Sequence, residues 1–327
     1  MALRVAIIGA GNWGAQHVRA FSARDDVEIV GVYSRTLANA ERRAQVAHCR
    51  AYDDIDAMLD AETPDLVSIC LPNTQHYAPT LQVIRRGFAV FAEKPLVFSL
   101  DEGRELVREA EKRELFFAIN FNHRFATPML KAKAAVDDGQ VGLLSFATWR
   151  FGGEGDASSG PDGNLIETQC HGLDLLEHLA GPIHSVSAEM TDRPGHGHST
   201  ISVALKFDSG AVGALIGSYD TSYAYPGTCT LEIDGSAGRV VVTDTVRRFE
   251  LSRSGDETRQ VWEAGYFNDR ERSFHATFDA HLDRLVPALL AGDPPPVPAT
   301  AGYRALLLAH SIIESERTGT RVTVPID

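Results

Sequence analysis

Short apolar runs alternate with segments of helical periodicity from the N-terminus to about residue 122. Runs such as VAII and LVSICL are apolar at every position, which is typical of strands covered on both faces. The alternation predicts a parallel sheet in an α/β domain. Strands are expected at 4–8, 28–33, 66–71, 89–92 and 116–120, and helices near 12–23, 36–47, 75–86 and 100–113. Ser99, with Glu102 three residues later, has the capping-box spacing at the start of the last helix.

The pattern changes after residue 122, where longer strands alternate between apolar and polar positions. Turn sequences such as FDSGAV and DGSAGR separate neighbouring strands, so this part predicts a mostly antiparallel sheet. Strands are expected at 143–151, 184–191, 199–207, 211–219, 228–234 and 238–243, and helices at 127–137, 164–179 and 303–316. We therefore expect an α/β protein of two domains, residues 1–122 and 123–327.

Composition narrows the possible partners. The 31 basic and 44 acidic residues leave a formal charge of −13, which argues against nucleic acid or an anionic membrane as partner. Four scattered cysteines without a CxxC pair favour reduced thiols over disulfides or a zinc site. The N-terminus lacks signal-peptide features, and no apolar run reaches the ~20 residues that span a bilayer. We expect a soluble cytoplasmic protein.

The segment IIGAGNWGAQH follows the first predicted strand and opens the first predicted helix. Its glycines, Gly9, Gly11 and Gly14, have the G-x-G-x-x-G spacing of a dinucleotide-binding loop. The first allows a tight turn, the second lets a pyrophosphate approach the backbone, and the third permits close helix packing. The alternative is a glycine-rich turn without a ligand.

The end of the second strand indicates which dinucleotide binds. A carboxylate about 20 residues after the glycine motif would bind the ribose of NAD. Here the strand ends Val32-Tyr33-Ser34-Arg35, without a carboxylate. Ser34 and Arg35 are suited to a 2′-phosphate, so NADP is favoured over NAD; the alternative is that Arg35 is a solvated loop residue.

Polar residues also follow two other strands, at the edge of the sheet where ligands bind in doubly wound folds. One segment runs Leu71-Pro72-Asn73-Thr74-Gln75-His76, and the other is Glu93-Lys94-Pro95. Taken alone, Glu93-Lys94 is explained by a structural ion pair at a strand end. On a sheet that binds a nucleotide, Lys94 becomes a candidate catalytic residue.

Four segments together resemble the glucose–fructose oxidoreductase / inositol dehydrogenase (Gfo/Idh/MocA) family over nearly the whole chain. They are Gly9 to Gly14, Pro72-Asn73 with His76, Glu93-Lys94-Pro95, and NLIETQCHGLDLLEHL at 164–179. The resemblance implies a Rossmann domain followed by an α/β domain with a large open sheet, whose exposed face would form a homodimer or homotetramer. It also implies NAD(P)-dependent oxidation or reduction of a sugar, cyclitol or similar polyol.

The resemblance also implies roles for single residues. Lys94 would be the catalytic lysine, preceding a cis Lys94-Pro95 bond, and Glu93 would hold its ammonium group. The cofactor site would include the three glycines with Asn12, Trp13, Ser34, Arg35, Pro72, Asn73, His76 and Glu93.

In the segment 164–179, Glu167, His171, Asp174 and His178 fall on one face of a regular helix. The family pattern is Asp-x-x-x-His followed by Asp, so His171 corresponds to the general acid/base and Glu167 to its supporting carboxylate, one methylene longer. Asp174 would brace the site. Glu-x-x-x-His can also bind a metal, with His123 or the loop at 195–198 as a further ligand; the resemblance implies no metal, and none is expected.

The segment FNHRF at 121–125 lies where the two predicted domains meet. Asn122 and Arg124 are candidates for substrate contact, together with Lys94, Glu167 and His171; a domain-junction salt bridge is the alternative for Arg124. The loop 152–162 is expected to line or cover the substrate.

The expected reaction is hydride transfer between the nicotinamide and a secondary alcohol carbon. His171 would exchange the hydroxyl proton and Lys94 would stabilise charge on the oxygen. The alternatives are a dihydrodiol-type or keto-sugar reductase of secondary metabolism, and a non-catalytic nucleotide-sensing regulator. The presence of both Lys94 and His171 argues against the regulator.

Overall fold

The computed structural model describes residues 2–155 and 159–326 and divides into two compact units. The N-terminal unit consists of the residues up to Phe121 together with Phe278–Tyr303. The C-terminal unit consists of Asn122–Thr277 and the residues from Arg304 onwards. Phe278–Tyr303, which lies within the predicted second domain (123–327), thus belongs to the N-terminal unit.

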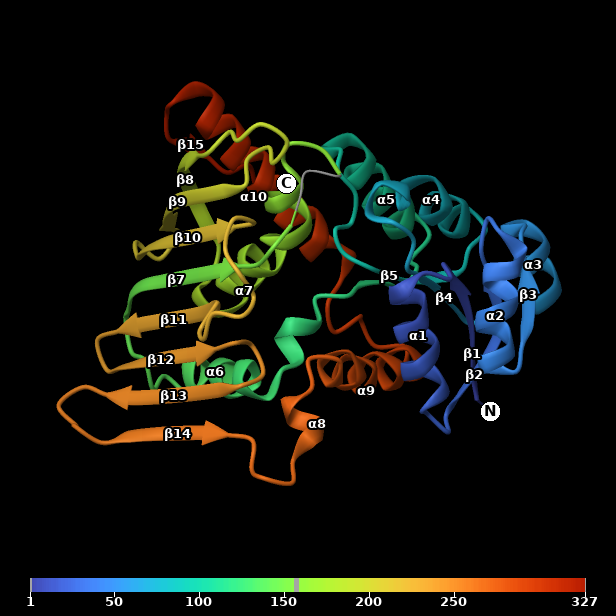
Figure 1. The fold of residues 1–327 in the computed structure, drawn as a ribbon, viewed down its shortest axis with the longest axis horizontal. Helices are drawn as coiled ribbons and strands as arrows, with labels where there is room; N and C mark the ends of the chain where they lie inside the picture. Colours follow the sequence, from blue (N-terminus) through green and yellow to red (C-terminus); the bar gives the residue numbers. More distant parts are fainter. Residues whose placement is uncertain (1, 156–158, 327) are drawn as a thin grey trace. The chain divides into compact units, whose positions relative to one another are not determined.

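A six-stranded sheet forms the centre of the N-terminal unit, in the order β3-β2-β1-β4-β5-β6 (Figure 1). All neighbouring strands are parallel, as the apolar runs predicted. The strands are β1 (Leu3–Ile8), β2 (Val27–Tyr33), β3 (Arg50–Tyr52), β4 (Leu66–Ile69), β5 (Ala89–Ala92) and β6 (Phe117–Ile119). The strand order reverses direction between β1 and β4, so a dinucleotide is expected to bind beside the carboxyl ends of these strands.

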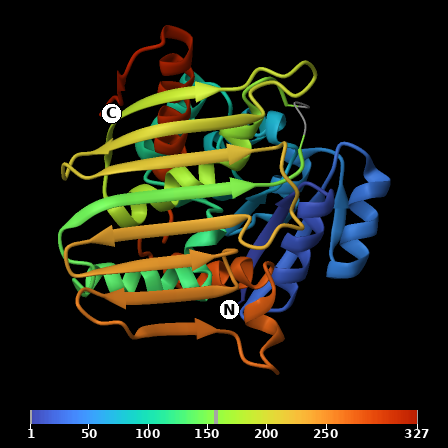
Figure 2. The same ribbon diagram turned by 60° about the vertical axis from the view of Figure 1, so that its left-hand side comes forward.

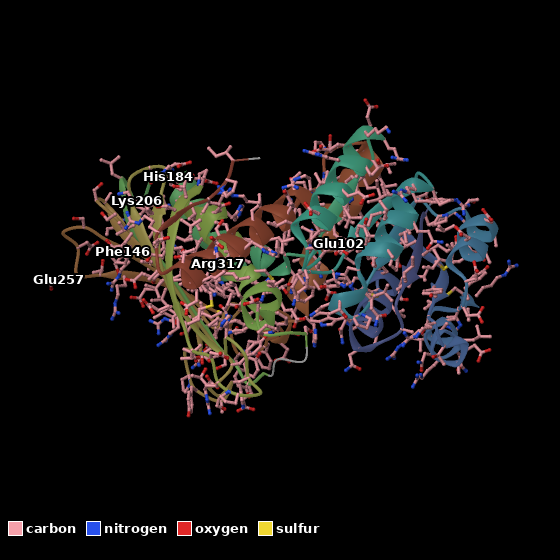
Figure 3. All side chains as sticks on the ribbon, turned by 90° about the horizontal axis from the view of Figure 1, so that it is seen from above. Glu102, Phe146, His184, Lys206, Glu257 and Arg317 are labelled. Carbon is pink, nitrogen blue, oxygen red and sulfur yellow. The ribbon has the colours of Figure 1, made fainter. Side chains whose placement is uncertain are left out.

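With one exception, the helices between these strands begin and end close to the predicted positions. They are α1 (Asn12–Ser22), α2 (Leu37–Ala47), α3 (Ile55–Glu62), α4 (Tyr77–Arg85) and α5 (Leu100–Lys112). Ser99 caps α5, because its side chain accepts the Glu102 N–H at 3.5 Å. Figure 3 labels Glu102 in this first turn. The sequence analysis did not predict α3 or the half-exposed three-residue strand β3, which has no apolar run.

Helix α9 (Ala276–Ala291) contributes to the core of the N-terminal unit although it follows the C-terminal sheet in sequence. Phe278, Leu282, Leu285 and Val286 are almost fully buried in one cluster with residues of β1, α1 and β5. The sequence analysis did not predict this helix. Their spacing of i, i+4, i+7 and i+8 is nonetheless that of an amphipathic helix.

The C-terminal unit is built on a nine-stranded sheet in the order β14-β13-β12-β11-β7-β10-β9-β8-β15 (Figure 2). Only β7 and β10 pair in parallel among its described strands, so the predicted antiparallel character is confirmed. The strands are β7 (Leu144–Gly152), β8 (Ile183–Met190), β9 (Thr200–Phe207), β10 (Val212–Ser218), β11 (Cys229–Gly235), β12 (Gly238–Thr243), β13 (Arg248–Arg253), β14 (Arg259–Glu263) and β15 (Val322–Thr323). The sequence analysis did not predict β13 or the two edge strands, β14 and β15.

Helices lie on one face of this sheet (Figure 2). They include α6 (Thr127–Asp137) and α7 (Cys170–Ala180); α8 (Asp269–Arg272) follows β14, and α10 (Ala299–Thr318) begins in the N-terminal unit and continues into this one. Buried and exposed residues alternate along β9, as expected for strands with one covered face. Within the described residues, no helix combines the length and apolarity needed to cross a bilayer.

Removal of the Leu282 side chain is expected to destabilise the N-terminal unit. Leu282→Ala leaves a cavity in a fully buried position and should lower the free energy of unfolding by about 2–5 kcal/mol in denaturant titration. Leu290→Ala on the same helix changes a side chain that is 54% exposed and should alter it by only about 0.5 kcal/mol. Equal effects of the two changes would contradict the assignment of α9 to this core.

Candidate active site

The glycine loop between β1 and α1 is shaped by close backbone contacts. Gly9 has a φ of +128°, and a Cβ there would lie 2.5 Å from the Cys70 carbonyl oxygen. A Cβ on Gly14 would lie 2.2 Å from the Gly9 carbonyl oxygen. Only glycine is accommodated at these two positions, and their packing holds the start of α1 against β1.

Gly11 differs from these two glycines because its missing Cβ leaves open space. It is the N-cap of α1 and, like Asn12 and Trp13, it is exposed. No side chain at Gly11 therefore blocks the approach to the first N–H groups of α1, which suits a dinucleotide pyrophosphate. The residues present thus fit the cofactor that the spacing predicted.

An arginine that the sequence analysis did not select also lies at this loop. Arg43, from α2, donates from Nε to the Ala10 carbonyl oxygen at 3.2 Å and from Nη2 to that of Gly11 at 3.3 Å. Arg35 is exposed and Ser34 half-buried, directly after β2. No spacing rule marks Arg43, because only the packing of α2 beside the loop places its cation there.

The strand end after β4 contains one buried histidine among more open residues. Pro72 is exposed and Asn73 is half-buried at the start of a 3₁₀ turn, η1 (Asn73–Gln75). The His76 ring is 1% exposed, with Nδ1 2.7 Å from the Pro95 carbonyl oxygen and Nε2 3.0 Å from that of Leu71. The structure therefore places His76 between the two strand ends, inside the protein.

The Glu93-Lys94-Pro95 turn follows β5, and the Lys94-Pro95 bond is cis, as the resemblance implied. Lys94 is half-buried, whereas Glu93 is 4% exposed. Glu93 Oε1 accepts from Asn120 Nδ2 at 2.7 Å and from His17 Nε2 at 3.0 Å. Burial opposes the charge of Glu93, but the hydrogen bond and charge of His17, with Lys94 and Asn120, outweigh it and lower the pKa of the carboxyl group.

In the C-terminal unit, the expected continuous helix over 164–179 is interrupted. Glu167 lies in a π-helical turn, η3 (Asn164–Thr168), and His171 lies in α7, with Gln169 between them. The wide turn closes through the Gln169 N–H and the Asn164 carbonyl oxygen at 3.0 Å. The fully buried Gln169 amide also bonds Trp149 Nε1 at 3.1 Å and Asn164 Oδ1 at 3.1 Å, which stabilises this turn.

The π turn corrects the expectation that Glu167 and His171 are spaced along one regular helix. A π turn holds more residues than an α turn, so the direction of Glu167 does not follow from 100° per residue. Glu167 is half-buried, whereas His171 is 6% exposed.

The FNHRF segment packs against α7 through two side chains. The His123 ring stacks on His171, with centroids 3.9 Å apart and planes 16° from parallel. Arg124 donates from Nε and Nη2 to the buried Asp174 carboxylate at 2.7 and 2.5 Å. Burial raises the pKa of Asp174, although pairing with Arg124 opposes the rise.

Asn122 and Arg124, expected as substrate contacts, thus have partners within the C-terminal unit. Asn122 is 4% exposed and donates from Nδ2 to Thr277 Oγ1 at 2.7 Å. Asp174, expected to brace the site, holds Arg124. The sequence analysis did not select His123 for contact with His171, since ring stacking between separate elements has no sequence pattern.

The sequence analysis also did not select two tyrosines, Tyr219 and Tyr223, that contact the start of the 152–162 loop. Tyr219 shares a hydrogen bond of 2.7 Å with Thr168, and burial raises the pKa of its phenol, with Glu167 adding to the rise. A Cβ on Gly155 would lie 2.7 Å from the Tyr219 ring, and one on Gly153 would lie 2.1 Å from Tyr223. The start of the 152–162 loop therefore lies against both rings; its residues 156–158 are outside the described residues.

Metal binding was the alternative use of Glu167 and His171. Among residues 2–155 and 159–326, no group of three or more His, Cys, Asp or Glu side chains is arranged to hold a metal ion.

Comparisons with known proteins cover both units. Residues 3–121 match a family described as "Oxidoreductase family, NAD-binding Rossmann fold", GFO_IDH_MocA, and residues 129–241 match the "GFO/IDH/MocA C-terminal domain". D-glucoside 3-dehydrogenase of Escherichia coli (strain K12) is 32% identical over 59% of this chain and 59% of its own length. Inositol 2-dehydrogenase of Rhizobium meliloti (strain 1021) is 24% identical over 99% of this chain and 100% of its own.

Solved structures share the whole fold. An NAD binding oxidoreductase from Klebsiella pneumoniae superimposes with a TM-score of 0.91 at 20% identity, covering 100% of both chains. Levoglucosan dehydrogenase in complex with NADH and levoglucosan has a TM-score of 0.89 at 18% identity, covering 99% of this chain and 100% of its own. Since the family models match a segment in each unit and an inositol dehydrogenase aligns over almost the full chain, this protein belongs to the Gfo/Idh/MocA family of NAD(P)-dependent oxidoreductases.

Proposed function

We propose that this protein transfers a hydride between a nicotinamide cofactor and a secondary alcohol or ketone carbon of a sugar, cyclitol or similar polyol. One observation carries the proposal: Lys94 follows β5 at the same sheet edge as the glycine loop that follows β1, with only β4 between these strands. A cation at that edge lies on the side where the fold binds its dinucleotide. The names of the relatives, a glucoside dehydrogenase and two inositol dehydrogenases among them, support a polyol substrate.

The chain's own residues supply positioning, charge and proton exchange. The nicotinamide, when bound, supplies the hydride acceptor or donor. The Lys94 ammonium stabilises negative charge that develops on the reacting oxygen. His171 exchanges the hydroxyl proton; because its Nδ1 is buried, we assign this exchange to Nε2. His123 keeps the His171 ring in one orientation by stacking on it, and Glu167 supports the histidine from the preceding turn.

We further propose that NADP is preferred to NAD. No carboxylate ends β2, and Ser34 and Arg35 occupy the position that meets the adenine ribose in this fold. Arg43 adds a second cation at the loop. A guanidinium pairs well with a phosphate because it offers several donors in one plane.

We also propose a homodimer or homotetramer that forms through the exposed face of the nine-stranded sheet. Val212 and Ile216 of β10 are 52% and 44% exposed, which supplies apolar surface for such a contact.

The catalytic assignments predict large losses of turnover without loss of cofactor binding. In assays of cofactor reduction with inositols and aldoses, Lys94→Ala should lower kcat by about 10²- to 10³-fold. His171→Ala should lower kcat by about 10²- to 10⁴-fold. Lys112→Ala, at an exposed position of α5, and His184→Ala, labelled at the C-terminal unit in Figure 3, are matched controls and should retain activity. Tight NADPH binding without turnover on any polyol would contradict the proposal.

The cofactor preference is tested by direct binding. Arg35→Ala should weaken NADPH binding about tenfold in calorimetric titration, because a charge-assisted hydrogen bond to the 2′-phosphate is lost, and should leave NADH binding unchanged. Arg42→Ala removes a neighbouring exposed arginine bonded to Asn39 and serves as the control. Tighter binding of NADH than of NADPH by the wild-type protein would overturn the preference.

A further inference from the structure

A chain of buried polar side chains runs beneath the Lys94 turn, inside the N-terminal unit. Each of its members is at most 4% exposed, and they come from α1, β4, the Glu93 turn, the end of β6, and α9. In order they are Ser68, His17, Glu93, Asn120 and His281. All the printed links are between 2.6 and 3.0 Å.

The chemistry of the groups fixes the direction of most of these hydrogen bonds. The ionised Glu93 carboxylate only accepts, so His17 Nε2 and Asn120 Nδ2 both donate to Oε1. With the Asn120 amide nitrogen used in this way, its Oδ1 accepts from His281 Nδ1 at 2.9 Å. Ser68 Oγ lies 2.6 Å from His17 Nδ1 and holds the other side of that ring.

A serine, a histidine and a carboxylate in sequence also form the catalytic arrangement of hydrolases. Here Ser68 is fully buried within the central strand β4, so no substrate reaches its hydroxyl group. Ser68, His17 and Glu93 therefore do not form a hydrolytic site. Their hydrogen bonds fix the orientation of the His17 ring and the Glu93 carboxylate.

The second carboxylate oxygen of Glu93 connects this series of hydrogen-bonded side chains to Lys94. Glu93 Oε2 accepts the Lys94 backbone N–H at 3.3 Å. His17 and Asn120 both bind Oε1, so they set the rotation of the carboxylate and thereby the place of Oε2. On the other side of the turn, His76 Nδ1 lies 2.7 Å from the Pro95 carbonyl oxygen. The backbone around Lys94 is thus held from both sides by side chains.

The energetic cost of this arrangement indicates a function beyond stability. Burying a carboxylate is unfavourable unless charge and hydrogen bonds compensate, and apolar side chains often replace such groups without loss of stability. When every member of a buried polar network has its hydrogen-bond partners, however, the network specifies a single geometry.

We propose that His17 and Asn120 are positioning residues that act through Glu93 to hold Lys94 in its reactive geometry. This inference rests on the proposed function, because it needs Lys94 to act on the substrate. The network would also oppose any rotation of Glu93 toward solvent. Misplacement of a catalytic group by about 1 Å can cost about 100-fold in rate, so loss of the His17 donor should affect turnover without contact with the substrate.

The test combines His17 and Lys94 variants in one cycle. His17→Phe keeps a ring but removes both hydrogen bonds, and should lower kcat about 10- to 100-fold, with KM for the polyol and Kd for NADPH unchanged within about threefold. His17→Gln retains an amide donor near the Nε2 position and should restore most of the loss. In the Lys94→Ala background, His17→Phe should have no further effect on kcat, because its influence passes through the lysine.

Hydrogen exchange supplies a second measurement that does not need turnover. In His17→Phe, a peptide spanning Glu93–Phe98 should exchange faster than in the wild type, whereas a β1 peptide should not. Ser315→Ala is the matched control, since it also loses two hydrogen bonds, to Ala188 and Thr320, but belongs to the C-terminal unit. It should leave both kcat and this peptide unchanged.

Two outcomes would overturn the positioning role: equal losses from His17→Phe in the wild-type and Lys94→Ala backgrounds, or unchanged kcat and exchange in His17→Phe. Full activity of Lys94→Ala is a different result, because it would overturn the proposed function itself.

Discussion

The buried charge of Glu93 is the constraint on which the N-terminal unit depends most. A carboxylate at the end of a core strand has to be compensated from several directions, and it receives donors from α1 and from the end of β6 as well as from its own turn. Because those donors are held in place in turn by Ser68 and His281, the compensation involves β4 and α9. The hydrogen bonds that compensate this buried charge also set the carboxylate that bonds the Lys94 backbone N–H.

Helix α9 contributes both apolar and polar side chains to the N-terminal unit. Phe278 lies 4.7 Å from the His17 ring and 6.0 Å from the Phe91 ring, centroid to centroid, so the helix covers the buried network with aromatic surface. His281 of the same helix bonds Asn120. The buried polar network therefore lies in an apolar environment. There each hydrogen bond is strong, and the loss of a hydrogen-bond partner would be destabilising.

The C-terminal unit orients His171 by different means. Here the general acid/base candidate is held by ring stacking on His123 and by a wide helical turn fixed through the Gln169 amide. The ion pair between Arg124 and Asp174 anchors the FNHRF segment beside the same helix. The ring of His17, which is hydrogen-bonded at both nitrogens, is by contrast poorly suited to exchange a proton with a substrate.

The sequence by itself determined the parallel strands, the glycine loop, the Ser99 cap, the antiparallel sheet and the family, because each is encoded by local periodicity or by a short motif. It also marked Lys94 and His171 as candidates. Only the tertiary structure decided that Glu93 faces inward to His17 and Asn120, that His123 stacks on His171, that Arg43 reaches the glycine loop, and that α9 packs with β1. These contacts join residues far apart in the chain, and the direction of a side chain in them depends on neighbouring elements that no local pattern describes.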